Sequence, residues 1–292
     1  MKNIFIFYLV LLFSSGDKSL VAQSLGITGD AADVTTTTTQ GIVLMGGGTD
    51  VDAAIKWMIN KSGGGDFVVI RASGTNAYNS YIYGLGSVNS VETFLINSST
   101  LAQNASIAQA IRNAEGLFIA GGDQSDYVTY WKNSPIEDAI NYLINTKKAP
   151  VGGTSAGCAI LTKVYYSAIS SSVTSSEALA DPYGSIGQDI SYDDFISSPF
   201  LDNTISDTHY LVRGRQGRHA TFLARMIKDK SLTNVKGIGV DEKTAVCIDE
   251  TGKAIVFGSS NAVFIRQFCN GPETCAAGQK LTWNHGVKVY SV

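Results

Sequence analysis

Short apolar runs that alternate with segments of helical spacing are the feature that most constrains the fold of this chain. Runs that fit buried strands occur at residues 41–45, 67–70, 91–96, 116–120 and 150–153. Helical spacing is found at residues 50–60, 106–113, 127–132, 136–145 and 158–166, with Pro135 as a break. Near-continuous apolar strands between helices are typical of a parallel sheet with both faces covered. We therefore predict an α/β fold, a three-layer sandwich with a mostly parallel central sheet.

The last part of the chain has a different pattern. After Gly237, strand-like runs follow one another without helices, at residues 245–248, 254–257, 262–266 and 287–290. We expect a meander that closes the same domain, so that residues 41–292 form a single domain. An unbroken threonine run at 35–39 indicates that residues 23–40 are a linker.

The N-terminus has the pattern of an export signal. Lys2 precedes an apolar run at residues 4–13, and small residues follow. A run of about ten residues is too short to span a bilayer but suits a signal peptide. We predict that residues 1–22 are a signal peptide, cleaved after Gly16 or Ala22, and that the protein is exported to the periplasm or secreted without a stable membrane anchor.

Composition excludes several classes of partner. The formal net charge is -3, so no generally basic surface for nucleic acid is expected. The four cysteines, Cys158, Cys247, Cys269 and Cys275, lack the spacing of a zinc site, and we predict neither a metal nor a cofactor. Cys269 and Cys275 flank a turn-like loop, and both a disulfide and two free thiols stay open.

A candidate nucleophile lies in the segment Gly-Thr-Ser-Ala-Gly at residues 153–157. This Gly-x-Ser-x-Gly pattern lies between an apolar strand and a helix, as in the sharp turn that exposes a nucleophilic serine. The N–H of Ala156 can then face a developing oxyanion. A serine nucleophile needs a base, and the chain has three histidines, His209, His219 and His285, which composition does not distinguish.

Three motifs in order make the assignment more specific. They are Gly-Gly-Asp-Gln at 121–124, the serine turn at 153–157, and Asp-Thr-His-Tyr-Leu-Val-Arg-Gly-Arg-Gln-Gly-Arg at 207–218. Over about residues 40 to 265 the chain resembles the cyanophycinase-type serine peptidases, a family that includes bacterial aspartyl dipeptidase. The resemblance implies a class I glutamine amidotransferase-like sandwich and a serine peptidase that cleaves an aspartyl-type bond through an acyl-enzyme.

The resemblance also implies roles for individual residues. Ser155 matches the nucleophile, His209 the base and Glu177 the acid that orients the base, with Asp181 as the alternative acid. Gly122 matches the second oxyanion donor beside Ala156. The implied substrate contacts are Asp123, Gln124, Asp207, Arg213, Arg215 and Arg218. Guanidinium groups bind carboxylates in a bidentate manner, which suits an aspartyl substrate. Some of these arginines could instead pair with Asp207 and shape the histidine loop.

Two features depart from the family pattern. Thr208 precedes the histidine where cyanophycinase has glutamine, which puts cleavage of cyanophycin in doubt. A tyrosine-rich loop at residues 71–90 could wall a substrate pocket or serve only packing. The expected partner is a peptide or aspartyl dipeptide, and a homodimer is one possible assembly.

Three other functions compete with this interpretation. One is a catalytically silent binding protein on the same fold. Another is nucleotide binding by the glycines at 46–48, which lack the spacing of a phosphate-binding loop. Amidotransfer would need cysteine at the turn, whereas Cys158 lies about one helical turn beyond Ser155.

Overall fold

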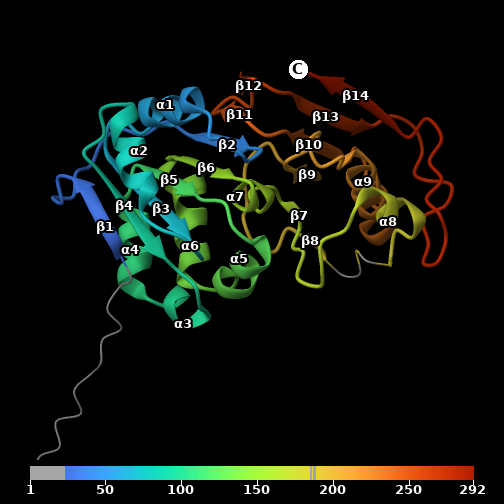
Figure 1. The fold of residues 1–292 in the computed structure, drawn as a ribbon, viewed down its shortest axis with the longest axis horizontal. Helices are drawn as coiled ribbons and strands as arrows, with labels where there is room; N and C mark the ends of the chain where they lie inside the picture. Colours follow the sequence, from blue (N-terminus) through green and yellow to red (C-terminus); the bar gives the residue numbers. More distant parts are fainter. Residues whose placement is uncertain (1–23, 185, 187–188) are drawn as a thin grey trace, which may run out of the picture.

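The computed structural model of this protein describes residues 24–184, 186 and 189–292. Its strands form two sheets that lie side by side, with helices packed on them (Figure 1). The predicted signal peptide at 1–22 lies outside the described residues. Within the described part of the chain, no helix has the length and apolar character needed to cross a bilayer.

The first sheet has eight strands in the order β1-β4-β3-β5-β6-β2-β11-β12. Its strands are β1 (Ser24–Gly29), β2 (Gly41–Met45), β3 (Asp66–Arg71), β4 (Ser90–Leu95), β5 (Gly116–Ile119), β6 (Pro150–Thr154), β11 (Thr244–Asp249) and β12 (Ala254–Gly258). The five strands from β4 to β2 are parallel, and β1, β11 and β12 add antiparallel edges. The predicted mostly parallel central sheet is confirmed.

Helices cover both faces of this sheet and make it the middle of three layers. They are α1 (Asp52–Lys61), α2 (Ala77–Leu85), α3 (Ser99–Ala102), α4 (Ala105–Asn113), α5 (Gln124–Trp131), α6 (Pro135–Tyr142) with a π-helical turn Leu143–Lys147, and α7 (Ala156–Ala159). In β2, Ile42 and Leu44 pack in the core with α4 and α6, whereas Val43 and Met45 pack in the core with α1 and α2. Period-two alternation thus places apolar side chains on both faces.

The second sheet has six strands in the order β14-β13-β10-β9-β7-β8. They are β7 (Val164–Tyr166), β8 (Ile190–Tyr192), β9 (Thr204–Asp207), β10 (Lys236–Val240), β13 (Ala262–Gln267) and β14 (Val287–Ser291). Two helices accompany it, α8 (Ser175–Ala180) and α9 (Gln216–Lys230). Phe222 of α9 packs with Val263 and Ile265 of β13 in a third core, so α9 covers one face of this sheet.

Four local predictions were wrong. The helix expected at 158–166 ends at Ala159, because Val164, Tyr165 and Tyr166 form β7, where β-branched and aromatic side chains pack well. The linker expected at 23–40 contains β1, which pairs with β4. The expected meander is divided, since β11 and β12 join the first sheet while β13 and β14 join the second. The tyrosine-rich segment at 71–90, which was expected to be a loop, contains α2.

Candidate active site

The turn at Ser155 lies where β6 ends and α7 begins. β6 is buried in the middle of the first sheet, and Ser155 has φ 52° and ψ -114°, a sparsely populated conformation for a residue with a side chain. A Cβ on Gly153 would lie 2.5 Å from the carbonyl carbon of Gly157, and a Cβ on Gly157 would lie 2.2 Å from the Ile119 oxygen. Only glycines therefore fit on either side of the serine in this turn.

His209 reaches this turn from the second sheet. It lies two residues beyond the end of β9, and its Nε2 lies 2.8 Å from Ser155 Oγ. The backbone N–H of His209 donates to the Gly46 carbonyl at 2.8 Å, and the N–H of Ser155 donates to the Met45 carbonyl at 3.0 Å. The last residue of β2 and the residue that follows it thus hold Ser155 and His209. The other two histidines do not approach Ser155: His219 is buried against the Ile205 carbonyl, and His285 lies in a loop.

The carboxylate that contacts the imidazole is Glu242. Its Oε1 lies 2.6 Å from His209 Nδ1, and its side chain is 30% exposed. Glu242 follows β10, which is the strand next to β9 in the sheet. Because the two strands are parallel, their carboxyl ends place the histidine and the glutamate at the same edge.

Glu177, to which the family resemblance gave this role, does not contact His209 in the structure. It is the third residue of α8 and forms a capping box, in which its Oε2 accepts from the Thr174 N–H at 2.8 Å. The alternative, Asp181, accepts from the Tyr183 N–H at 3.0 Å. A signal for Glu242 was present, since an acidic pair, Asp241 and Glu242, follows directly after the apolar run of residues 237–240.

The surroundings of His209 keep its imidazole neutral near pH 7. Burial lowers the pKa of His209, the hydrogen bond with Glu242 raises it, and the positive charges of Arg213 and Arg215 lower it; the net shift is downward. An ionised Glu242 accepts the Nδ1 proton, which leaves the Nε2 lone pair directed at the Ser155 hydroxyl. In this tautomer the imidazole can remove a proton from the serine.

Two further predicted residues flank the serine. Ala156 is the first residue of α7 and is buried. The glycine pair at 121–122 follows β5, and a Cβ on Gly121 would lie 3.5 Å from Ser155 Cβ, in van der Waals contact. The turn that contains Gly122 therefore lies against the serine side chain.

Asp123 and Gln124 begin the next helix. Asp123 is the N-cap of α5, and its Oδ1 accepts from the Ser125 N–H at 2.9 Å and from the Ser125 hydroxyl at 2.8 Å. Gln124 is the first residue of that helix and is half-buried. One Asp123 oxygen is thus already bonded within the protein, where it caps α5.

Three of the predicted substrate contacts instead form a buried ion cluster. Asp207 accepts from Arg218 Nη2 at 2.5 Å and from its Nε at 2.8 Å, and Arg215 Nη1 lies 3.3 Å away. Burial raises the pKa of Asp207, but the charge and hydrogen bonds of Arg218, together with the charge of Arg215, outweigh burial and hold this pKa below its ordinary value. Asp207, Arg215 and Arg218 therefore brace the histidine loop, and of the three arginines in this segment Arg213 is the exposed one.

Asp207→Asn is expected to destabilise the fold by about 3–5 kcal/mol, because it leaves the Arg218 charge buried without its partner. Urea unfolding of parent and variant measures the difference. Asp138→Asn, the same change at an exposed position in the first turn of α6, is the control and should cost less than about 1 kcal/mol. Equal midpoints for the two variants would contradict the bracing role.

An acidic pocket of about 330 Å³ opens beside the loop that follows β2. Its lining includes Gly48, which lies two residues after Gly46, the residue whose carbonyl accepts from the His209 N–H. Tyr78 of α2 donates to Asp50 at 2.6 Å, and Tyr81 donates to Asp52 at 2.7 Å. The tyrosine-rich segment therefore supplies a pocket wall, and Tyr78 also packs on Phe118 of the sheet.

The cysteine nearest in sequence to Ser155 is Cys158. Cys158 is fully buried, and burial raises the pKa of its thiol, so it is no competing nucleophile. All four cysteines are free thiols in the structure. Across the described ranges, no three His, Cys, Asp or Glu side chains cluster in a way that could hold a metal ion.

Comparison with known proteins identifies the family. Residues 42–256, which include Ser155, His209 and Glu242, match the model of peptidase family S51. The chain belongs to this family. The S51 family is one of serine peptidases, and its curated relatives include cyanophycinases from Synechococcus elongatus, 24% identical over 179 residues, and from Trichormus variabilis, 22% identical over 175 residues.

These matches cover 61% and 60% of the chain but 50% and 53% of the relatives, so the chain spans about half the length of the curated relatives it matches. Among solved structures, a peptidase from an acI-B1 Actinobacterium superposes with a TM-score of 0.52 at 14% identity, over 85% of this chain and 98% of that one. This likeness supports the class I glutamine amidotransferase-like sandwich.

Proposed function

We propose that this protein is a serine peptidase that hydrolyses an aspartyl-type peptide bond through an acyl-enzyme. The observation that carries the proposal is the chain of contacts from Ser155 through His209 to Glu242, with distances of 2.8 and 2.6 Å. A nucleophile, a base and an acid that orients the base are the parts that acyl transfer needs.

In the proposed mechanism, Ser155 Oγ attacks the scissile carbonyl carbon while its proton moves to His209 Nε2. Glu242 accepts the Nδ1 proton in a hydrogen bond and stabilises the imidazolium. The N–H groups of Ala156 and Gly122 would stabilise the oxyanion. The imidazolium then gives its proton to the leaving amine, and the C–N bond breaks. Water attacks the acyl-enzyme by the same route and frees the serine.

The substrate preference of the proposal rests on two charged features. The exposed Arg213 guanidinium lies close enough to lower the pKa of His209, and it could hold a substrate carboxylate in a bidentate manner. Asp50 and Asp52, in the pocket that starts at Gly48, would favour a positive group on the same substrate, such as a free amine. An aspartyl dipeptide carries both kinds of charge.

Arg213→Gln is expected to move the acidic limb of the kcat/KM profile to higher pH. Activity needs the neutral imidazole, and the positive charge of Arg213 lowers the pKa of His209, so its removal raises that pKa. Profiles from pH 4 to 8 measure the shift. Arg213→Lys keeps the charge and should keep the limb in place while KM rises, because an ammonium lacks the bidentate geometry. An unmoved limb in Arg213→Gln would contradict this assignment.

Export is the second part of the proposal and rests on the apolar run behind Lys2. Expression of the full chain in a bacterium, followed by cell fractionation, tests it. Recovery outside the cytoplasm with a new N-terminus near residue 17 or 23 is expected. Uncleaved protein confined to the cytoplasm would end this part of the proposal.

The catalytic part is tested by covalent labelling together with a substrate panel. A fluorophosphonate should label Ser155, as located by peptide mass, and the panel contains α- and β-aspartyl dipeptides and cyanophycin. We expect hydrolysis of aspartyl dipeptides and slower cleavage of cyanophycin, because Thr208 is shorter than glutamine. Absence of both labelling and hydrolysis in folded protein would favour the alternative, a catalytically silent binding protein.

A further inference from the structure

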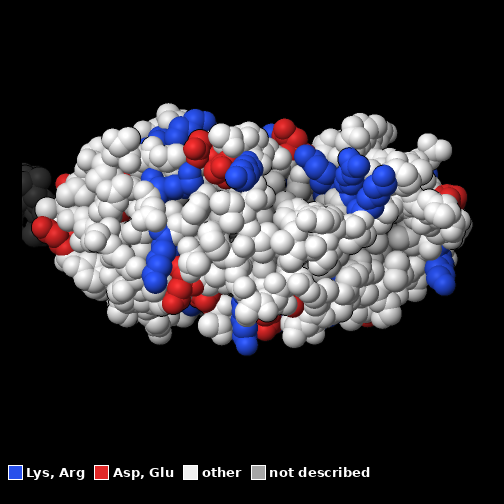
Figure 2. Space-filling model, turned by 90° about the horizontal axis from the view of Figure 1, so that it is seen from above, with Lys and Arg blue, Asp and Glu red and all other residues white. Residues whose placement is uncertain are grey.

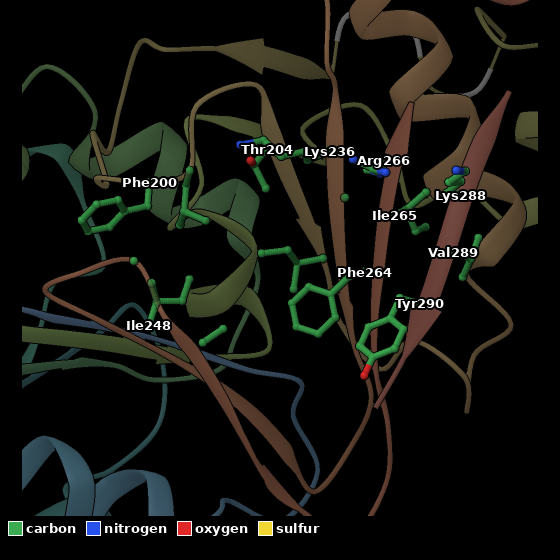
Figure 3. A pocket seen from close by; sticks show the side chains of 15 residues that line it. Phe200, Thr204, Lys236, Ile248, Phe264, Ile265, Arg266, Lys288, Val289 and Tyr290 are labelled. Atoms are coloured by element: carbon green, nitrogen blue, oxygen red, sulfur yellow. The ribbon is translucent and has the colours of Figure 1, made fainter. Parts of the chain in front are cut away.

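A second cavity lies at the opposite end of the second sheet from His209. It has a volume of about 500 Å³, which is within the range of small-molecule sites. Thr204 and Lys236, which begin β9 and β10, line it, whereas His209 and Glu242 follow the far ends of the same strands. Figure 3 shows its two walls, with Phe200 and Ile248 facing Phe264 and Tyr290 across the opening.

The strand register arranges one wall of this cavity in two rows. Lys236, Arg266 and Lys288 are direct neighbours across β10, β13 and β14. Two residues along each strand, Ile238, Phe264 and Tyr290 form the next row. Because side chains two apart point to the same face, both rows face the cavity, on the side of the sheet away from α9.

The basic row places three like charges on neighbouring strands. Like charges directly opposite each other on neighbouring strands are destabilising. Among the described residues, no Asp or Glu forms a salt bridge with these three side chains; Asp202, whose pKa Lys236 helps to lower, is held by Lys163 at 2.6 Å. Lys288 lies 3.8 Å over the Phe268 ring. Figure 2 shows basic side chains gathered over the part of the molecule where β13 and β14 lie.

The apolar row leaves aromatic surface in contact with water. Phe200 is 45% exposed and Tyr290 is 68% exposed, whereas Leu201 and Ile238 form a buried floor. Removing such surface from water is favourable. The cavity therefore offers an apolar slot that ends at three basic side chains, none of which forms a salt bridge within the described residues.

We propose that this cavity binds an amphipathic anion that has a single aliphatic chain. The chain would lie along Ile238, Phe264 and Tyr290, and a carboxylate or phosphate head would meet Lys236, Arg266 and Lys288. Such an anion supplies both the negative charge and the apolar cover that the cavity lacks. The site uses no residue of the Ser155 turn.

Calorimetric titration of the protein with sodium decanoate below its critical micelle concentration tests the proposal. One saturable site is expected, with decan-1-ol at least ten-fold weaker and decyltrimethylammonium without measurable binding. The Ser155→Ala variant should bind decanoate as the parent does, so the outcome is independent of the proposed peptidase activity. Absence of saturable heat with decanoate, or equal affinity for decan-1-ol, overturns the proposal.

Variants at exposed positions locate the site without disturbing the core. Arg266→Gln combined with Lys288→Gln should weaken decanoate binding at least ten-fold, and Tyr290→Ser should also weaken it. Lys280→Gln, at an exposed lysine outside the cavity, is the matched control and should leave affinity unchanged. Thermal unfolding checks that each variant is folded. Parental affinity in the double variant overturns the assignment.

Co-sedimentation with phosphatidylglycerol vesicles separates the two sources of such an anion. If decanoate binds and vesicles do not, the ligand is a free acid; if both bind and both are lost in the double variant, the ligand is a lipid. Vesicle binding without decanoate binding overturns the proposal in favour of a membrane-contact surface. Self-association that Tyr290→Ser abolishes, without decanoate binding, overturns it in favour of a second copy.

Discussion

Ser155→Ala is expected to lower kcat by about 10⁵- to 10⁶-fold while KM changes little. The change removes the only proposed nucleophile, and the loss of one member of such a unit costs nearly as much as the loss of all. The residual rate would come from the oxyanion donors and from substrate binding. Initial rates on the aspartyl dipeptide that the parent hydrolyses best measure the effect.

Ser176→Ala is the matched control for this change. Ser176 is an exposed serine of α8, and its replacement should leave kcat within about two-fold of the parent, since it touches no reacting atom. Both variants should show the thermal unfolding profile of the parent. A Ser155→Ala protein that keeps more than about one hundredth of the parental rate would exclude this serine as the nucleophile.

Glu242→Gln is expected to lower kcat by about 10³- to 10⁴-fold. Glutamine keeps the shape but lacks the charge that stabilises the imidazolium, and its amide can favour the wrong imidazole tautomer. We expect the smaller loss, about 10³-fold, because the Glu242 side chain is 30% exposed and water can partly replace its carboxylate. Steady-state kinetics on the same dipeptide separate the loss in kcat from any change in KM.

Glu177→Gln makes the identical change at the acid that the sequence suggested. Its carboxylate caps α8, so near-parental kcat with a small loss of helix stability is expected. The ratio of the two variants' kcat values decides which glutamate orients the base. A larger loss in Glu177→Gln than in Glu242→Gln would refute the assignment of the acid.

Local chemistry made the Ser155 turn predictable. The Gly-Thr-Ser-Ala-Gly segment at 153–157 follows an apolar strand, and the close approaches at Gly153 and Gly157 explain why glycine stands at both positions. The parallel sheet was predictable for a similar reason, because buried strands such as β2 and β3 are apolar on both faces.

The acidic pair after residues 237–240 marked Glu242 as a candidate, but its contact with His209 was not predictable from local patterns. Glu242 lies 33 residues from His209 in sequence and meets it because β9 and β10 are parallel neighbours, with the 15-residue helix α9 between them. A chain that contains strands in two separate sheets gives no local sign of which strands pair. Glu177, which the resemblance matched to the acid, instead forms a capping box with Thr174 at the start of α8. A capping box has a sequence pattern of its own, which explains why a glutamate occurs there.

The carboxyl end of β2 links the formation of the Ser155–His209 pair to the joining of the two sheets. Ser155 and His209 come from different sheets, yet their backbone N–H groups donate to the consecutive carbonyls of Met45 and Gly46. The first sheet folded alone would carry the Ser155 hydroxyl without its base, and the second sheet folded alone would carry the His209 imidazole without its nucleophile. During refolding, peptidase activity should therefore return only when the two sheets have docked on each other. The rate at which activity returns would then measure the rate of tertiary assembly.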